Sequence, residues 1–164
     1  MLIQLSVLAC LEEDTGTSTY DLFDMIAGSS SGGLITCLIL GRRISAGQII
    51  QMALQEKLLE KMMVAHWMHR LLNKLQIRPK YTGKQKSSTL QAELANLRLS
   101  SLSKRILIPC FNLNQDRLEI FTNENSFDFL LSEIADACTA APSYYPPVRM
   151  EDGNWRMDGG VGMN

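Results

Sequence analysis

A serine between glycines is the pattern in this 164-residue chain that most directly indicates chemistry. Ser30 is central in a G-x-S-x-G segment that reads Gly28, Ser29, Ser30, Ser31, Gly32, Gly33. A serine on a tight strand-to-helix turn presents its hydroxyl as a nucleophile, and the glycines let the two segments approach closely. The pattern is also typical of an anion-binding loop or of a turn that only packs. It lacks the Lys of a phosphate-binding G-x-x-x-x-G-K-[ST] loop, which argues against a nucleotide site.

Asp158 is the second candidate, and it precedes Gly159 and Gly160 near the end of the sequence. An aspartate at a strand end can project into a site while the glycines turn the backbone away. Asp-Gly is equally a plain turn signal. Because a nucleophilic serine needs a proton acceptor, Asp158 is the carboxylate that we consider for that role.

The two histidines, His66 and His69, are weaker candidates. Either one as the base would give the chain order Ser–His–Asp, which is not among the familiar orders for this chemistry. No cysteine stands at a zinc-like interval from them. We therefore predict that both histidines lie at or near the surface, with no metal and no cofactor.

The four cysteines stand among apolar neighbours, and they are Cys10, Cys37, Cys110 and Cys138. No C-x-x-C pair occurs, so we predict reduced, buried and inert thiols in a reducing compartment. The N-terminus lacks a basic region followed by an apolar run, and no apolar stretch approaches about 20 residues. These features favour a cytoplasmic or membrane-peripheral protein, with the compartment left open.

The charge is unevenly distributed although the formal net charge is only −1. The segment 61–86 carries seven Lys and Arg and no acidic residue. Such a segment attracts anionic surfaces, for example an anionic membrane, unless it is simply a solvated basic face. Met62, Met63, Trp67 and Met68 add an apolar stripe that is typical of a core helix or of a helix lying on a membrane. No nucleic-acid recognition motif accompanies the charge.

Helical and strand patterns are interspersed along the whole chain, which predicts one α/β domain over residues 1–164. The predicted helices cover 2–13, 32–40, 46–59, 60–75, 89–97 and 130–141. The predicted strands cover 23–27, 105–113, 118–122, 148–150 and 155–157, with a hairpin turn at 114–116 and a loop over 77–88.

In combination and in this order, the two motifs resemble the patatin-like phospholipases. Residues 23–28 resemble the strand that leads into that family's serine turn. Residues 79–83 resemble its P-x-Y-x-G segment, and residues 137–147 resemble the helix and proline turn before its aspartate. The similarity extends over nearly all of the chain.

The resemblance implies a three-layer α/β/α fold with a central, mostly parallel sheet. It also implies a lipid acyl hydrolase of the phospholipase A type, acting on a lipid or lysophospholipid without metal or cofactor. Ser30 would be the nucleophile and Asp158 the proton acceptor, with an acyl-enzyme between the two half-reactions. The alternative is a catalytically impaired or inactive lipid- or anion-binding domain of the same fold.

The resemblance also concerns the oxyanion hole. The family carries a glycine-rich D-G-G-G-x-R-G stretch just upstream of its first helix, and the N–H groups of that stretch form the hole. This sequence begins at that helix and stops soon after Asp158, so we expect a domain truncated at both ends. The backbone N–H of Ser31 is the donor that we expect it to retain.

Overall fold

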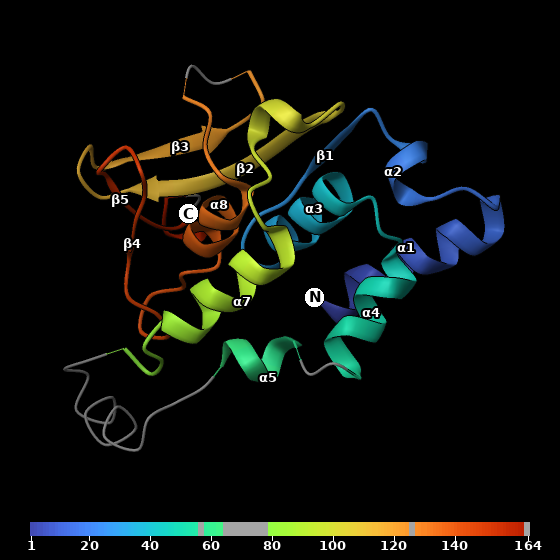
Figure 1. Cartoon of the computed structure of the whole chain (residues 1–164), viewed down its shortest axis with the longest axis horizontal. Helices are drawn as coiled ribbons and strands as arrows, with labels where there is room; N and C mark the ends of the chain where they lie inside the picture. Colours follow the sequence, from blue (N-terminus) through green and yellow to red (C-terminus); the bar gives the residue numbers. More distant parts are fainter. Residues whose placement is uncertain (56–57, 64–78, 125–126, 163–164) are drawn as a thin grey trace.

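The framework of the molecule is a five-stranded sheet with helices packed against it (Figure 1). The structure is a computed structural model that describes residues 1–55, 58–63, 79–124 and 127–162. Its elements are α1 (Leu2–Thr15), α2 (Thr19–Leu22), β1 (Met25–Ala27), α3 (Ser31–Arg42), α4 (Ala46–Leu54), α5 (Leu58–Met62), α7 (Lys84–Leu94), η1 (Leu99–Ser101), β2 (Arg105–Asn112), β3 (Arg117–Phe121), α8 (Leu131–Cys138), β4 (Val148–Arg149), β5 (Trp155–Asp158) and η2 (Gly159–Val161).

The sheet has the order β1-β2-β5-β4, and β3 also pairs with β2. The α/β class is confirmed, but the pairing is more mixed than the mostly parallel sheet that we expected. Only β1 and β2 are parallel among the described pairs, and β2–β3, β2–β5 and β4–β5 are antiparallel. Short turns join β2 to β3 and β4 to β5, and a short turn can join only antiparallel neighbours.

Strand β2 holds β1 and β5 along the same edge. Its Arg105 N–H and Leu107 carbonyl bond to the β1 segment, and the N–H of Leu113, just after β2, bonds to the carbonyl of Trp155 in β5. Backbone groups of successive residues in a strand point to opposite edges, so these odd-numbered residues share one edge. The carboxyl ends of β1 and β5 therefore run toward each other along β2.

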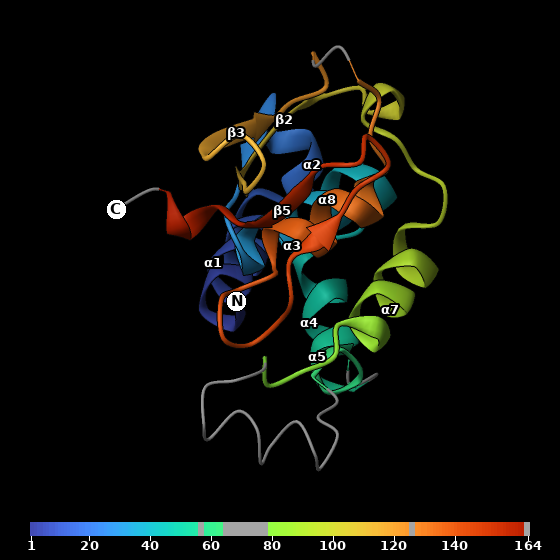
Figure 2. The same ribbon diagram turned by 90° about the vertical axis from the view of Figure 1, so that its left-hand side faces the viewer.

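The helices α3 and α8 pack against one face of the sheet, and α7 packs against them from outside (Figure 2). Ile106, Ile108 and Cys110 of β2 are buried on this face. On the other face at β1, Met25 is half exposed. The described helices thus provide a helical layer on one face, and on the opposite face Gly162, just after η2, lies close to the ring of Phe111 in β2.

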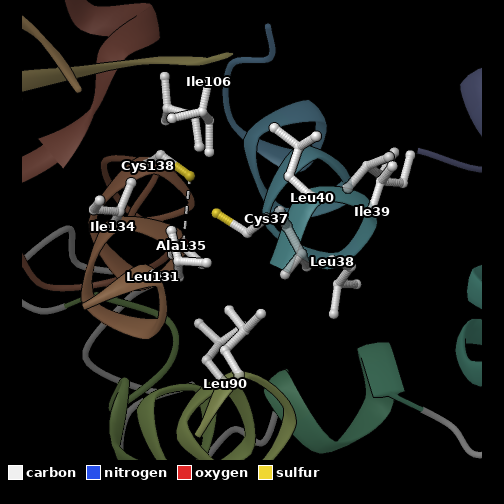
Figure 3. Packing of buried hydrophobic residues seen from close by; sticks show 14 of the residues in the cluster. Cys37, Leu38, Ile39, Leu40, Leu90, Ile106, Leu131, Ile134, Ala135 and Cys138 are labelled. Carbon is white, nitrogen blue, oxygen red and sulfur yellow. Dashed lines mark hydrogen bonds between the residues drawn. The ribbon is translucent and has the colours of Figure 1, made fainter. Parts of the chain in front are cut away.

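Helix α3 is buried almost all round, as its apolar sequence, interrupted only by Thr36 between Leu34 and Leu40, predicts. Figure 3 shows the core where Cys37 of α3 faces Cys138 of α8. Leu90 of α7 belongs to the same cluster. The prediction of buried thiols is confirmed for Cys37, Cys110 and Cys138 and is wrong for Cys10, which is exposed. In α1 only Leu5 is buried, so the face that carries Cys10 stays in solvent.

Two predicted helices have bounds that differ clearly from those of the structure. The helix expected over 89–97 is α7, which begins at Lys84 because Gly83 adopts a left-handed conformation at its N-cap. The helix expected over 46–59 ends at Leu54, and α5 follows separately. Most of the helix predicted over 60–75, including both histidines, lies outside the described residues. Met62 is buried and Met63 is half exposed.

Among the described residues, no single helix is long and apolar enough to cross a membrane. The pair α3 and α4 would pass by length and composition together, but it bends by 119° at its break.

Arg156 is a buried residue of β5 whose side chain bonds to neighbouring elements. Its side chain is 1% exposed and donates hydrogen bonds to both oxygens of Asp152 at 2.8 and 2.7 Å, and to Glu119 at 2.7 Å. A buried guanidinium is tolerated only with such partners, since an unpaired buried charge is very costly. These bonds connect β5 to β3 and to the turn before β5.

Stability should depend on pH through Asp152, whose pKa the hydrogen bonds from Arg156 lower to about 2. The ionised form of Asp152 is therefore favoured in the folded state. Its contribution to the free energy of unfolding is present above about pH 4 and is lost as the pH falls toward 2. Urea unfolding should show Asp152→Asn less stable than the unmodified chain by on the order of 1–2 kcal/mol at pH 6. The difference should shrink at pH 3. The exposed Asp14→Asn should show no such change, and an unaltered difference at pH 3 would contradict the assignment.

Candidate active site

The turn between β1 and α3 places Ser30 in a strained backbone conformation. Its φ and ψ are 54° and −124°, a combination that residues other than glycine rarely adopt. A Cβ on Gly28 would lie 2.3 Å from the carbonyl oxygen of Gly32, so no larger residue fits there without movement. The strand-to-helix turn predicted from G-x-S-x-G is confirmed.

The neighbouring helix also requires close approach. A Cβ on Gly33 would lie 2.7 Å from Sγ of Cys138. This glycine lets α3 contact α8, and the Cys138 thiol lies 3.6 Å from the carbonyl oxygen of Ser30. Burial raises the pKa of the Cys138 thiol well above its ordinary value, so it remains a neutral packing group and not a competing nucleophile.

Asp158 ends β5 and is directly paired with Cys110 of β2. Directly opposed residues of an antiparallel pair point to the same face, so the Asp158 side chain lies on the face that α3 and α8 cover. It is 6% exposed. Its Oδ1 accepts a hydrogen bond of 3.0 Å from the Gly160 N–H, which orients the carboxylate.

The two candidates meet because β1 and β5 end toward each other along β2. Both Ser30 and Asp158 line a cleft of about 470 Å³. The remaining lining residues are Ser29, Pro142, Gly160 and Val161. The sequence predicts the serine and the aspartate at the ends of strands, 128 residues apart, and the pairing of both strands with β2 brings them to one cleft.

Sequence reasoning missed the part played by the end of α8 and the loop that follows it. The Asp158 N–H donates a hydrogen bond of 3.2 Å to the carbonyl of Ala140, and Pro142 walls the cleft. The only sequence signal for this was the small-residue and proline run over 137–147.

The two predicted histidine candidates, His66 and His69, lie outside the described residues. Most of the basic segment 61–86 lies outside them as well. Within the described ranges, no three His, Cys, Asp or Glu side chains are close enough to form a metal site.

The family model of the patatin-like phospholipases matches residues 1–164, so the chain belongs to the patatin-like phospholipase family. Members of this family are lipid acyl hydrolases. The expectation drawn from the sequence motifs is thereby confirmed at the level of the family.

Individual relatives of the chain are also patatins or patatin-like proteins. The chain is 32% identical over 165 residues to Patatin-like protein 2 of Arabidopsis thaliana, covering 88% of this chain and 40% of that protein. It is 29% identical to Patatin-03 of Solanum tuberosum, covering 77% and 34%. The chain thus spans less than half the length of these relatives.

A solved structure shows the same fold at low identity. The structure of VipD from Legionella pneumophila matches with a TM-score of 0.56 at 13% identity, covering 98% of this chain and 43% of that chain. At this identity the match concerns the fold alone.

Proposed function

We propose that this chain is the nucleophile-bearing part of a lipid acyl hydrolase of the phospholipase A type, with Ser30 and Asp158 as its catalytic dyad. The observation that carries the proposal is the shared cleft of Ser30, on its strained turn, and the nearly buried Asp158. Family membership supports the lipid substrate.

The reaction would proceed in two half-reactions. The Ser30 Oγ attacks the ester carbonyl carbon while Asp158 accepts its proton, and that proton then leaves with the departing alcohol, here the lysolipid. A water attacks the acyl-enzyme, Asp158 takes the water's proton and returns it to Ser30 Oγ, and the fatty acid is released. No metal or organic cofactor is needed for these steps.

A carboxylate is a weak base for a serine hydroxyl, so its surroundings must help. Asp158 is 6% exposed, so little water competes with a serine hydroxyl for its carboxylate. The positive end of α3, which begins at Ser31, favours the developing negative charge, and the Ser31 N–H is the oxyanion donor that we assign. The family's glycine-rich stretch would add further donors.

Contact with an anionic membrane is a further part of this proposal. Of the basic segment 61–86, the described Lys80 lies beside the cleft wall, because its N–H bonds to the carbonyl of Ser143 next to Pro142. Its ammonium lies 5.5 Å from the half-exposed ring of Tyr144. A cation and an aromatic ring near the cleft would suit an interface with anionic lipid.

The second candidate function is a lipid-binding domain without turnover. One relative, with 27% identity over 148 residues, is named "Probable inactive patatin-3-Kuras 1" from Solanum tuberosum, so the family fold also occurs in a protein so described. Both functions share the cleft and differ in whether Ser30 reacts.

Incubation with a fluorophosphonate probe tests the proposal directly, because the probe modifies only an activated serine. We expect one label per chain, and peptide mass analysis should place it on Ser30 rather than on Ser29 or Ser31. Release of p-nitrophenol from p-nitrophenyl butyrate above the buffer rate should accompany it. A folded chain that takes up no label and releases no product would favour the binding domain.

A further inference from the structure

Lys86 is a charged residue that the structure buries almost completely. It lies in the first turn of α7, and its side chain is 1% exposed. Removing an ammonium from water costs several kcal/mol unless close partners replace the water. Its position therefore depends on a dedicated set of contacts.

The polar contacts lie at the carboxyl end of α8. The Lys86 Nζ lies 2.9 Å from Oδ1 of Asp136 and donates to the Asp136 carbonyl at 2.7 Å and to Oγ1 of Thr139 at 3.3 Å. It also lies 4.3 Å from the centre of the Tyr145 ring. The last carbonyls of a helix lack partners within the helix and favour a cation, so Lys86 closes the end of α8.

The end of α8 in turn contacts both halves of the candidate dyad. The Cys138 thiol lies 3.6 Å from the Ser30 carbonyl oxygen, and the Ala140 carbonyl accepts the Asp158 N–H at 3.2 Å. Cys138 and Ala140 are completely buried. A shift of this segment would therefore move Asp158 relative to Ser30.

Lys86 also lies within electrostatic reach of the cleft. Burial lowers the pKa of Lys86, while the carboxylates of Asp136 and Asp158 act in the opposite direction.

We propose that Lys86, paired with Asp136, is a positioning residue that holds the end of α8 and the Ala140 carbonyl so that Asp158 faces Ser30. The proposal rests on the function proposed above, because it assumes that Asp158 serves Ser30. Lys86 lines a separate pocket of about 440 Å³ and not the cleft, so it acts through α8 rather than on substrate.

The test replaces Lys86 by methionine, which keeps the length of the side chain and removes the charge. We expect kcat for p-nitrophenyl butyrate, per site titrated with fluorophosphonate, to fall about 10- to 100-fold while KM changes less than about 3-fold. Exchange of the Asp158 amide proton, followed by NMR, should become at least about 10-fold faster. Asp136→Asn is a milder change in the same pair, and it should produce a smaller fall in kcat and a smaller acceleration of Asp158 amide exchange.

Arg42→Met provides the matched control, because Arg42 and Glu93 form a surface ion pair that ties α7 to α3 instead of α8. It should leave kcat per site and Asp158 exchange unchanged. A folded Lys86→Met chain with unmodified kcat per site, or with unmodified Asp158 exchange, would overturn the proposal. If Lys86→Met does not fold, the same two readouts on Asp136→Asn decide.

The outcome is separable from that of the proposed function. A chain that takes no fluorophosphonate label would contradict the dyad, and the exchange of the Asp158 amide would then decide by itself whether Lys86 positions this residue.

Discussion

Replacing Ser30 by alanine should reduce hydrolysis of p-nitrophenyl butyrate by at least about 10³-fold, to the rate of buffer alone. Alanine removes only the hydroxyl that forms the acyl-enzyme. The fold should persist, because the strained conformation at Ser30 is imposed by the glycines around it and by the packing of α3 on α8. Thermal unfolding of the variant should therefore match or slightly exceed that of the parent chain, since a reactive hydroxyl held in the cleft contributes little to stability.

Ser88→Ala supplies the control, because Ser88 is exposed on α7 and its hydroxyl donates a local hydrogen bond to the Gln85 carbonyl. It should hydrolyse the ester at the parent rate. If Ser30→Ala retains more than a few per cent of that rate while folded, the nucleophile lies elsewhere and the dyad is wrong.

Asp158→Asn should lower kcat by about 10²- to 10⁴-fold, the range typical for loss of a general base. Asparagine keeps the shape of the side chain and an oxygen that can accept the Gly160 N–H, so the turn into η2 should persist. What it loses is the ability to take the serine proton. Single-turnover kinetics should show slower formation of the acyl-enzyme and slower hydrolysis of it, since Asp158 accepts a proton in both half-reactions.

Asp116→Asn is the comparison for this experiment. Asp116 is exposed in the turn between β2 and β3 and has φ of 50°, which asparagine adopts readily. The Asp116→Asn variant should hydrolyse the ester at the rate of the parent chain. Full activity in Asp158→Asn would mean that a different group accepts the proton, and His66 and His69 would then be the residues to replace next.

Local patterns predicted the elements next to the candidate site well. The run into Gly28 was correctly predicted as a strand, although β1 is largely exposed. The mostly apolar α3 follows from burial, and the turn at 114–116 follows from residues that favour hairpins. These signals arise within a few residues of sequence, so they survive without tertiary information. The start of α7 was missed because its early turns are polar, and the burial of Lys86 against α8 that supports them is a distant contact.

The burial of Cys10 was mispredicted for a related reason. The apolar neighbours of this cysteine in α1 suggested a core position, but helix α1 buries only Leu5 and leaves Ile3 and Val7 in solvent. Which face of a helix is covered depends on the elements beside it. For α1, the nearest packed neighbour is α4, a helix more than thirty residues further along the chain.

The sequence by itself determined the family, the α/β class and the two residues on which the chemistry is proposed to rest. The two residues could be found because the glycines around Ser30 and after Asp158 mark places where the local backbone conformation requires glycine. Only the tertiary structure decided that the two residues share a cleft. That depends on β2 holding β1 and β5 on one edge so that their ends converge, and on Lys86 closing α8 between them. Hydrogen bonds between strands and the pairing of a buried charge join residues far apart in the chain, and no local pattern specifies such partners.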